Sequence, residues 1–424
     1  PDKLKRWVEA ATAGPMSHVA ARCPRDRSTY HLPQSARAFA YYFLTSGYGC
    51  FWGANDHVAH FIQAVHTLSP TPSPNSTVLI DVGAAPYSPV GGDQSHTVLF
   101  LKLWGCQVPV LAFEPMSFTS LKRAVSEALP PNSSFERTSS GYTVMRTGDA
   151  RRCAELYEAP ASDSPREMYI APQPSSGANT ASLETVYQSK RYTKKKVHTR
   201  TIDAELERIG LREASILVLK ADVEGHEMAV LRGAHRAIEE GHVQAILIEY
   251  GDKSSPSIWR AMKTPRSAEP AAAQPADMPG FSLFSLRKWA STRGFEPFLL
   301  GSERRQPVLV PFGGEMWDDR YEVCRDKRFK YSRDGRSWSN MTAWSPDWSA
   351  VCWYDVVLLH TASPLYEPLT LRAAGLPRHF CAKLDRGWQP TWLMKPPPEE
   401  SSLKCAHPVS HGRGEVCTRF VIAE

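Results

Sequence analysis

Residues 216–250, with the sequence ILVLKADVEGHEMAVLRGAHRAIEEGHVQAILIEY, contain the pattern that decides the fold of this chain. Apolar runs at Ile216–Leu219 and Ala245–Ile248 predict two buried strands. The residues between them have apolar positions at helical spacing, so they predict an amphipathic helix. Two strands joined by a helix form a βαβ unit, in which the strands run parallel and helices cover both faces of the sheet. The stretch therefore predicts an α/β fold with a parallel sheet.

Acidic residues and a histidine follow these two strands. Asp222, Glu224 and His226 lie in the turn after the first strand, and Glu249 ends the second. In parallel α/β sheets, ligands bind beyond the carboxyl ends of the strands. Carboxylates and an imidazole at that edge can hold a polar ligand or accept a proton. The turn therefore predicts a functional site.

The segment 78–114 predicts a second unit of the same sheet. We expect Val78–Ala85 (VLIDVGAA) to form a buried strand that runs into a turn of small residues. A helix over Gln94–Trp104 and a strand over Val110–Glu114 follow. This layout is typical of nucleoside-binding half-sheets, because the glycine allows close backbone approach and the later carboxylate accepts hydrogen bonds from ribose hydroxyls. The strand-end acids are Asp81 and Glu114.

The composition indicates a globular protein. The chain has 424 residues, of which 42% are hydrophobic, and this content excludes wholesale disorder. The net charge of +6 is mild, and no nucleic-acid-binding motif accompanies the basic clusters, so we interpret them as solvated surface. No apolar run in the sequence approaches the ~18–20 residues of a membrane span.

Shifts in composition divide the chain into five parts. They are a helical N-terminal extension (1–75), an α/β core (76–300), a Trp-rich insertion (301–353), a last core strand (354–360) and a C-terminal extension (361–424). The tryptophans of the insertion can fill a satellite core or stack on a ligand, and packing is the preferred interpretation. The Trp- and Pro-rich residues 301–424 are the predicted surface for protein partners.

Cysteine and asparagine usage favours the secretory pathway, either the Golgi lumen or the extracellular space. The nine cysteines form no CxxC pair, which argues against a zinc ribbon. Three of the five asparagines, Asn75, Asn132 and Asn340, lie in N-x-S/T sequons, so we expect a glycoprotein. The alternative is an organelle after removal of a targeting peptide, since the chain begins at Pro1 rather than Met.

Several motifs together resemble those of one family, the FkbM-type S-adenosylmethionine-dependent methyltransferases. They are VLIDVGAA (78–85), AFEP (112–115), SGANTASL (176–183), TID (201–203), LKADVEGHEMAVLRGA (219–234) and ILIEY (246–250). The resemblance covers roughly residues 76–300 and the strand DVVLLH at 355–360. It implies a Rossmann-like, seven-stranded, mostly parallel sheet with one antiparallel strand and helices on both faces. It also implies S-adenosylmethionine as the cofactor.

The resemblance assigns the cofactor side of the site. The turn Asp81–Ala85, with Gly83 and Ala84, would hold the methionine part of S-adenosylmethionine. Glu114 would bind its ribose, and Asp149 would lie near the adenine. On this basis we expect O-methylation of a hydroxyl on a small molecule or a glycan.

The resemblance places Asp222, Glu224 and His226 on the acceptor side. Methyl transfer needs alignment of the two reactants more than covalent help, but an oxygen acceptor benefits from a general base. His226 and Asp222 are the candidates, although His226 can instead be a turn residue that orients the carboxylates, and Glu224 and Glu249 can pair with Lys220. We assign no metal ligand; a metal bound by Asp222, Glu224 and His226 is a weaker alternative.

One loop departs from the family pattern D-x-G-A-N-x-G. Here the residues after Asp81 continue as Val-Gly-Ala-Ala-Pro-Tyr, so the asparagine and the second glycine are absent. Pro86 lacks a backbone N–H, and Tyr87 adds bulk where glycine would allow close approach. The alternative function is therefore a catalytically inactive methyltransferase-like subunit of a larger assembly.

Overall fold

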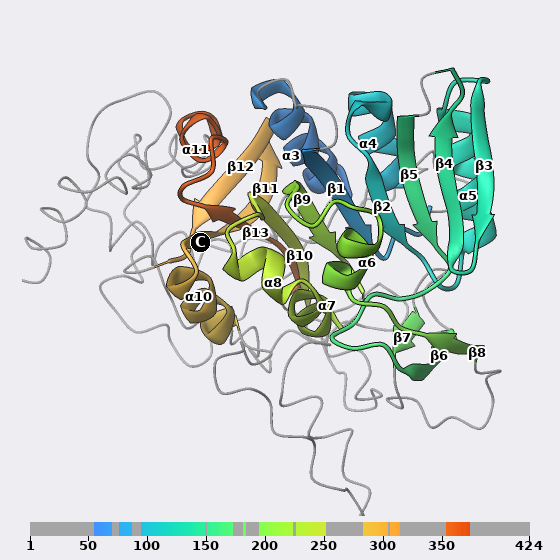
Figure 1. The fold of residues 1–424 in the computed structure, drawn as a ribbon. Coiled ribbons are helices and arrows are strands. Elements are labelled where there is room, and N and C mark those ends of the chain that lie inside the picture. Colours follow the sequence, from blue (N-terminus) through green and yellow to red (C-terminus); the bar gives the residue numbers. More distant parts are fainter. Residues whose placement is uncertain are drawn as a thin grey trace, which may run out of the picture.

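One sheet organises the protein (Figure 1). The computed structural model describes residues 55–69, 76–86, 95–148, 151–172, 181–183, 195–223, 226–251, 283–303, 306–313 and 353–373. Within them, the sheet has ten strands in the order β12-β11-β13-β10-β9-β1-β2-β5-β4-β3. In that order the strands are β12 (Gln306–Pro311), β11 (Phe295–Glu303), β13 (Trp353–His360), β10 (Ala245–Gly251), β9 (Ser215–Ala221), β1 (Thr77–Val82), β2 (Val110–Phe113), β5 (Arg151–Tyr157), β4 (Gly141–Arg146) and β3 (Ser133–Thr138).

The centre of the sheet is parallel, as the sequence predicts. Strands β10, β9, β1, β2 and β5 pair in parallel, whereas β13 lies antiparallel between β10 and β11. The count of ten strands differs from the expected seven because hairpins extend both sides. Residues 306–311, assigned from sequence to the Trp-rich insertion, form edge strand β12. On the other side β3 (SSFERT) was not predicted, because it lacks the apolar alternation of a half-buried strand.

Helices cover both faces of the sheet, as predicted. The first face carries α6 (Ile202–Arg208), α7 (Glu227–Gly233), α8 (His235–Glu239) and α10 (Leu283–Thr292), which lie in front of the sheet in Figure 1. The second carries α3 (Asn55–Leu68), α4 (His96–Trp104), α5 (Phe118–Ala128) and α11 (Tyr366–Ala373). Strand β1 packs against both helical layers. Ile80 lies in the apolar core on the first face, and Leu79 lies in the second core, on the other face.

Helices from both extensions join the second core. Phe61 and Ile62 of α3 are fully buried, and Leu369 of α11 is buried in the same apolar cluster. Residues 55–68 and 366–373 are therefore part of the folded core rather than separate appendages. No helix in the described part of the chain is long and apolar enough to span a membrane.

A second, small sheet lies beside the main one. Its strands, in the order β7-β6-β8, are β7 (Ala181–Leu183), β6 (Glu167–Pro172) and β8 (Lys195–His198). The sequence gives little signal for strands here, because the buried apolar residues described in this sheet are Met168, Ile170 and Val197, with Met116 packed against them. Lys195 of β8 attaches the sheet to the turn after β2, since its Nζ donates a hydrogen bond of 2.7 Å to the Pro115 carbonyl.

The helix predicted after β9 is divided at Ala234. Gly233 ends α7 beside the Ser162 carbonyl, and a Cβ built on Gly233 would lie 2.0 Å from that oxygen. Asp203, the second residue of α6, accepts hydrogen bonds from the Arg236 and Ala237 amides at the start of α8. The residue that caps α6 is Thr201, whose hydroxyl accepts from the Ala204 amide.

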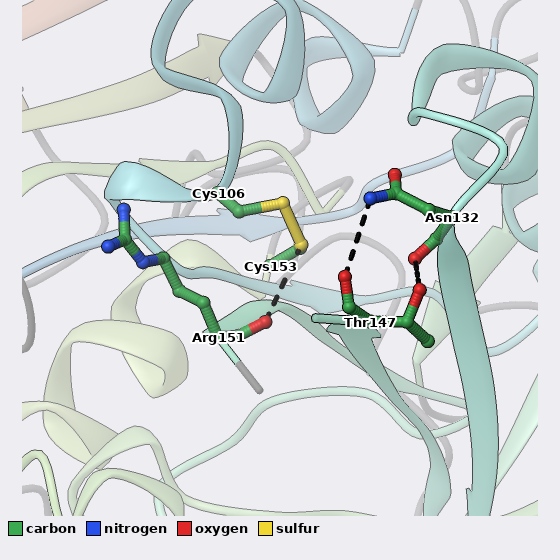
Figure 2. The surroundings of a disulfide bond; sticks show 5 residues. All are labelled: Cys106, Asn132, Thr147, Arg151 and Cys153. Atoms are coloured by element: carbon green, nitrogen blue, oxygen red, sulfur yellow. Dashed lines mark hydrogen bonds between the residues drawn. A yellow bond between two sulfur atoms is a disulfide. The ribbon is translucent and has the colours of Figure 1, made fainter. Parts of the chain in front are cut away.

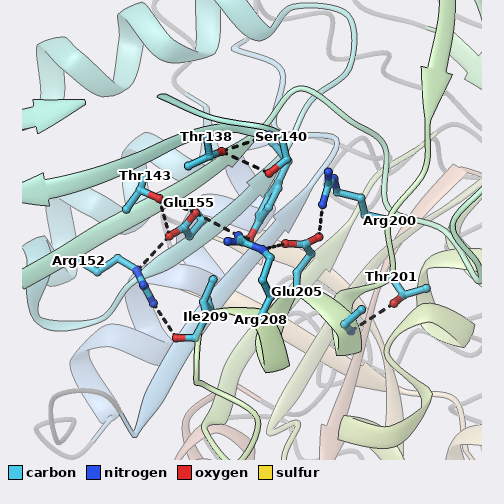
Figure 3. A network of polar contacts seen from close by, with 12 residues as sticks. Thr138, Ser140, Thr143, Arg152, Glu155, Arg200, Thr201, Glu205, Arg208 and Ile209 are labelled. Carbon is cyan, nitrogen blue, oxygen red and sulfur yellow. Dashed lines mark hydrogen bonds and ion pairs between the residues drawn. The ribbon is translucent and has the colours of Figure 1, made fainter. Parts of the chain in front are cut away.

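Two buried glutamates connect β5 to α6 (Figure 3). Glu155 of β5 accepts from the Thr143 hydroxyl and pairs with Arg152 at 3.0 Å and Arg208 at 3.4 Å. Glu205 of α6 pairs with the same Arg208 at 2.6 Å. Arg208 therefore joins two carboxylates that would be costly to bury alone.

We predict that Gly233→Ala destabilises the protein. The new Cβ would meet the backbone of Ser162, which cannot move aside as a side chain can, so we expect a loss of about 3 kcal/mol in the free energy of unfolding. Gly241→Ala is the matched control: Gly241 has φ +74 and open space around it, so the loss should be only the ~1 kcal/mol of left-handed strain. Chemical denaturation of both variants measures the difference, and equal losses would contradict the close-packing account.

Candidate active site

The structure brings four of the singled-out residues to one edge of the sheet. Strands β2, β1, β9 and β10 are consecutive neighbours and run parallel, so their carboxyl ends lie together. Glu114 follows β2, Gly83 follows β1, Asp222 follows β9, and Glu249 lies near the end of β10. This is the edge at which open α/β sheets bind ligands.

Gly83 permits the close approach of two of these strand ends. It has φ +78, and a Cβ on it would lie 1.8 Å from the Asp222 carbonyl oxygen. The Gly83 and Ala84 amides both donate to the Phe113 carbonyl, at 3.0 and 3.1 Å. The requirement for glycine therefore comes from the close approach of the turns that follow β1 and β9, and these two N–H groups hold the turn against β2.

Asp81 is buried and holds neighbouring residues in place rather than facing a ligand. The residue is fully buried, and its Oδ2 accepts from the Thr97 amide at 2.8 Å and the Thr97 hydroxyl at 2.7 Å. Its Oδ1 lies 3.2 Å from Lys220 Nζ. The side chain has no exposed surface through which the methionine part of a cofactor could contact it. We therefore revise the expected role of Asp81 to positioning α4 and Lys220.

Lys220 is the buried cation of this edge. Its Nζ lies 3.2 Å from Asp81, 3.5 Å from Asp222 Oδ2 and 3.3 Å from the Gly83 carbonyl, to which it donates a hydrogen bond. Burial alone would lower the pKa of Lys220, but the Asp81 and Asp222 carboxylates outweigh it and raise the pKa above its ordinary value. Lys220 therefore stays charged and holds the ends of the neighbouring strands β1 and β9 together.

Glu114 is oriented by its own turn. Its Oε1 accepts hydrogen bonds from the Met116 and Ser117 amides, both 2.6 Å long. Burial raises the pKa of the carboxyl above its usual range, although the two amides counteract that effect. Both bonds use the same oxygen, so the described residues leave Oε2 for another donor. A carboxylate fixed in this way can receive hydroxyl groups of a ligand.

Carboxylates gather around Asp222. The carboxyls of Asp222 and Glu249 are hydrogen-bonded, and Glu249 lies opposite Asp355 in the β10–β13 register. Burial, followed by the Asp222 and Asp355 charges, raises the pKa of Glu249 well above its usual range. Glu227 at the start of α7 is buried nearby and accepts from the Val223 amide at 3.1 Å. Glu249 therefore keeps its proton more readily than an ordinary glutamate and can share it with Asp222.

His226 precedes α7, but its side chain does not cap that helix. Its Nε2 lies 2.9 Å from the Ser162 hydroxyl, and Ser162 donates to Asp163 Oδ1 at 3.1 Å. Asp163 in turn pairs with Arg232 at 3.2 Å and Arg166 at 3.3 Å. His226 is thus held to the segment after β5 rather than to the carboxylates of its own turn.

This chain of bonds selects the tautomer of His226. The paired Arg166 and Arg232 help to lower the pKa of Asp163 in spite of its burial, so its carboxylate is ionised and can only accept. The Ser162 O–H donates to it, and the Ser162 oxygen must then accept from His226 Nε2–H. The lone pair of the imidazole is therefore on Nδ1. Burial, with Arg166 and Arg232, lowers the pKa of His226 to about 4.

Two predicted site residues, Asp149 and Glu224, lie outside the described residues, as does Tyr87. The sequence pattern did not point to Thr97, Ser162 or Asp163, because they approach the site from other elements. Lys220 was recognised as a partner for strand-end acids, and among the described residues it forms ion pairs with Asp81 and Asp222. Its charge inside an otherwise apolar strand was the available signal.

Among the described residues, one group of three side chains has metal-ligand proximity: Glu213, Glu240 and His242. Glu213 precedes β9 and His242 precedes β10, so the group lies at the amino-terminal edge, opposite Asp222. Both glutamates are exposed, and they pair with Arg212 and Arg236. We assign it no role in the site.

The fold is that of an α/β protein whose carboxyl sheet edge bears a glycine turn after β1, an acid after β2, and a carboxylate cluster after β9 and β10. Comparison with known families gives the class a name. Residues 81–281, just under half of the chain, match the family described as the methyltransferase FkbM domain, which confirms the predicted resemblance over those residues. No curated protein and no solved structure matches the chain.

We predict that Lys220→Met strongly destabilises the protein. Removing the cation leaves Asp81 and Asp222 without their buried counter-charge, a change that costs about 3–5 kcal/mol in comparable pairs. Lys196→Met removes an ion pair in which both partners are half exposed, so it should cost less than ~1 kcal/mol. Equal denaturation midpoints for the two variants would show that Lys220 is not the centre of the edge.

We predict that His226 is neutral at pH 7 with its proton on Nε2. Long-range ¹H–¹⁵N NMR spectra, assigned with His226→Gln, should show this tautomer and a pKa of about 4. The unfolded chain binds this proton from about pH 6.5 downward. The wild type should therefore lose stability as the pH falls from about 6.5 to 4, and His226→Gln should lose less over that window.

Ser162→Ala serves as the control, since it removes the acceptor that selects the Nε2–H tautomer. The preference for that tautomer should decrease in this variant. An unperturbed pKa near 6.5 in the wild type would contradict the buried arrangement.

Proposed function

We propose that this protein is an S-adenosylmethionine-dependent O-methyltransferase that acts on a hydroxyl of a small molecule or a glycan. The methyltransferase FkbM domain is the finding that carries the assignment to methyl transfer. The cofactor, the acceptor atom and the acceptor class are the proposed steps. They rest on the residues at the carboxyl edge of the sheet, where Glu114 is placed to bind a nucleoside and Asp222 to accept a proton.

The sheet supports a Rossmann-like methyltransferase core. The seven consecutive strands β5-β2-β1-β9-β10-β13-β11 consist of parallel strands with β13 as the antiparallel member. We interpret these as the catalytic core, and β12 and the β3–β4 hairpin as additions. This interpretation puts β1 and β9 at the centre, where the chain reverses direction across the sheet and ligands bind.

Glu114 is the residue that fits the cofactor best. The carboxylate follows β2, has one oxygen fixed by two amides, and can accept both hydroxyls of a ribose through the other. Gly83 and Ala84 line the adjacent strand end, with Ala84 O accepting from Ser95 at 3.2 Å. When bound, S-adenosylmethionine would supply a methyl group on a cationic sulfonium. The acidic residues Asp222 and Asp355 favour a cation at this edge.

Asp222 is the better candidate for the general base. It is half-buried, is held by Lys220 at 3.5 Å, and shares a hydrogen bond with a glutamate that favours its protonated form. His226 is neutral, but its ring is held through Nε2 to Ser162 and Asp163 rather than to the carboxylate cluster around Asp222. We therefore assign Asp222 to proton acceptance and His226 to orientation of the acceptor or of the turn.

The inactive-subunit alternative rests on the departure at Pro86 and Tyr87. Residues 81–281, which include this departure, match the methyltransferase family, and Pro86 follows a turn whose backbone hydrogen bonds to β2 are intact. These observations favour the enzyme. Contacts of residues 301–424 with protein partners remain a separate proposal, testable by affinity purification of the full chain.

We predict that S-adenosylmethionine binds and that Glu114→Gln weakens its binding about ten- to a hundredfold, the loss expected for a charged hydrogen-bond acceptor. Isothermal titration with S-adenosylmethionine and with S-adenosylhomocysteine measures both affinities. Glu136→Gln, an exposed glutamate on β3, is the matched control and should bind as the wild type does. Absence of heat with the folded wild type at high micromolar cofactor would overturn the proposal.

Asp222→Asn separates catalysis from binding in the same protein. A general base contributes about 10²–10⁴ in rate, so methyl transfer to hydroxyl-bearing acceptors should fall by that order while cofactor affinity is retained. Transfer is followed with radiolabelled methyl groups on a panel of glycans and small alcohols. The thermal midpoint of the variant, measured alongside, shows whether loss of the Lys220 contact has unfolded it. A folded variant with unchanged transfer would exclude Asp222 as the base.

A further inference from the structure

We propose that Asn132 is an N-glycosylation site and that the protein matures in an oxidising secretory compartment, where Cys106 and Cys153 form a disulfide. The modification lies away from the methyltransferase site. Two independent features carry the inference: the exposed sequon and the disulfide that lies near it (Figure 2).

The disulfide joins two elements that are 47 residues apart. Cys106 lies in the short 3₁₀ helix η2 (Gly105–Gln107), and Cys153 lies in β5. Both cysteines are buried in the second core, and Cys153 is fully buried. Disulfides of this structural kind form and persist in oxidising compartments and are rare where thiols are kept reduced. The pair therefore indicates the same compartment in which asparagines are glycosylated.

Asn132 has the surroundings that an N-linked glycan needs. It lies in the exposed turn between α5 and β3, and its sequon is completed by Ser134. Its neighbours Pro130, Pro131 and Thr147 are exposed as well. The Asn132 Nδ2 group donates one long hydrogen bond of 3.4 Å to the Thr147 carbonyl. A glycosylated amide retains one N–H, so the modified residue can keep this bond.

The position of Asn132 separates the glycan from the active site. Asn132 precedes β3, and the β3–β4–β5 register brings Ser133 opposite Arg146 and Arg146 opposite Arg151 at the start of β5. Asn132 therefore lies at the amino-terminal edge of the sheet, whereas Glu114 and Asp222 lie at the carboxyl edge. A glycan at this point would also shield β3, the edge strand, from pairing with another chain.

Glycosylation of Asn132 and oxidation of the two cysteines each need one external reactant. In glycosylation, the Asn132 amide nitrogen bonds to C1 of a polyprenyl diphosphate-linked oligosaccharide, the C1–O bond to the diphosphate breaks, and one amide proton is released. In oxidation, a protein disulfide oxidant accepts two electrons from the Cys106 and Cys153 thiols and becomes a dithiol.

Of the three sequons, Asn75 and Asn340 lie outside the described residues.

Peptide mapping of the full chain from its native cells tests the proposal. The unreduced digest should contain one peptide pair linked through Cys106 and Cys153. A peptide N-glycosidase in H₂¹⁸O should convert Asn132 to ¹⁸O-labelled aspartate. An unmodified Asn132 overturns the proposal whether or not the disulfide is present, and free Cys106 and Cys153 thiols overturn the assigned compartment.

The sequon itself provides a matched pair of variants for the full-length gene. Ser134→Ala removes the hydroxyl that the sequon requires, so the protein should migrate faster on a gel by one glycan. Ser133→Ala changes the adjacent serine at the variable position and should migrate like the wild type. Co-migration of Ser134→Ala, Ser133→Ala and wild type would overturn the proposal. Methyl transfer is measured on the same samples, and its presence or absence is independent of this outcome.

Discussion

The buried ammonium of Lys220 is the interaction on which the functional edge depends. It lies between Asp81 at the end of β1 and Asp222 after β9, and it donates to the carbonyl of the Gly83 turn. Burying one charge without its partners would be costly, so the three groups must be placed together. Asp81 also binds the first turn of α4 through Thr97. One cation thus fixes the turn after β1, the start of α4 and the carboxylate proposed as the base.

The same arrangement separates the two halves of the site. On the side of β2, Glu114 is held by amides of its own turn and needs no contact with Lys220 to be oriented. On the side of β10, burial raises the pKa of Glu249 and so favours its protonated form, which reduces the repulsion among crowded carboxylates. His226 is held by a third set of contacts, through Ser162 and Asp163. Glu114, proposed to bind the cofactor, and Asp222, proposed as the base, are therefore held by different contacts.

The sequence predicted the central part of the fold because its signals there are strong and local. Buried strands such as β1 and β10 are continuous apolar runs, and the turns after them contain glycine and acids. The elements outside this central part, and the break in the helix after β9, were harder to predict. Strand β3 is polar, the small sheet β7-β6-β8 has a minimal core, and the α7–α8 break at Ala234 follows from the contact of Gly233 with Ser162. Each of these depends on residues distant in the sequence.

The sequence by itself determined the class of fold, the edge of the sheet that bears the site, and the family, because strand periodicity and strand-end residues are properties of short segments. Only the tertiary structure decided what each residue does there. It turned Asp81 from a ligand contact into a buried partner of Lys220 and Thr97, and it tied His226 to Ser162. It also paired Cys106 with Cys153 across 47 residues. Such roles depend on which side chains meet across elements, and one-dimensional patterns do not encode those meetings.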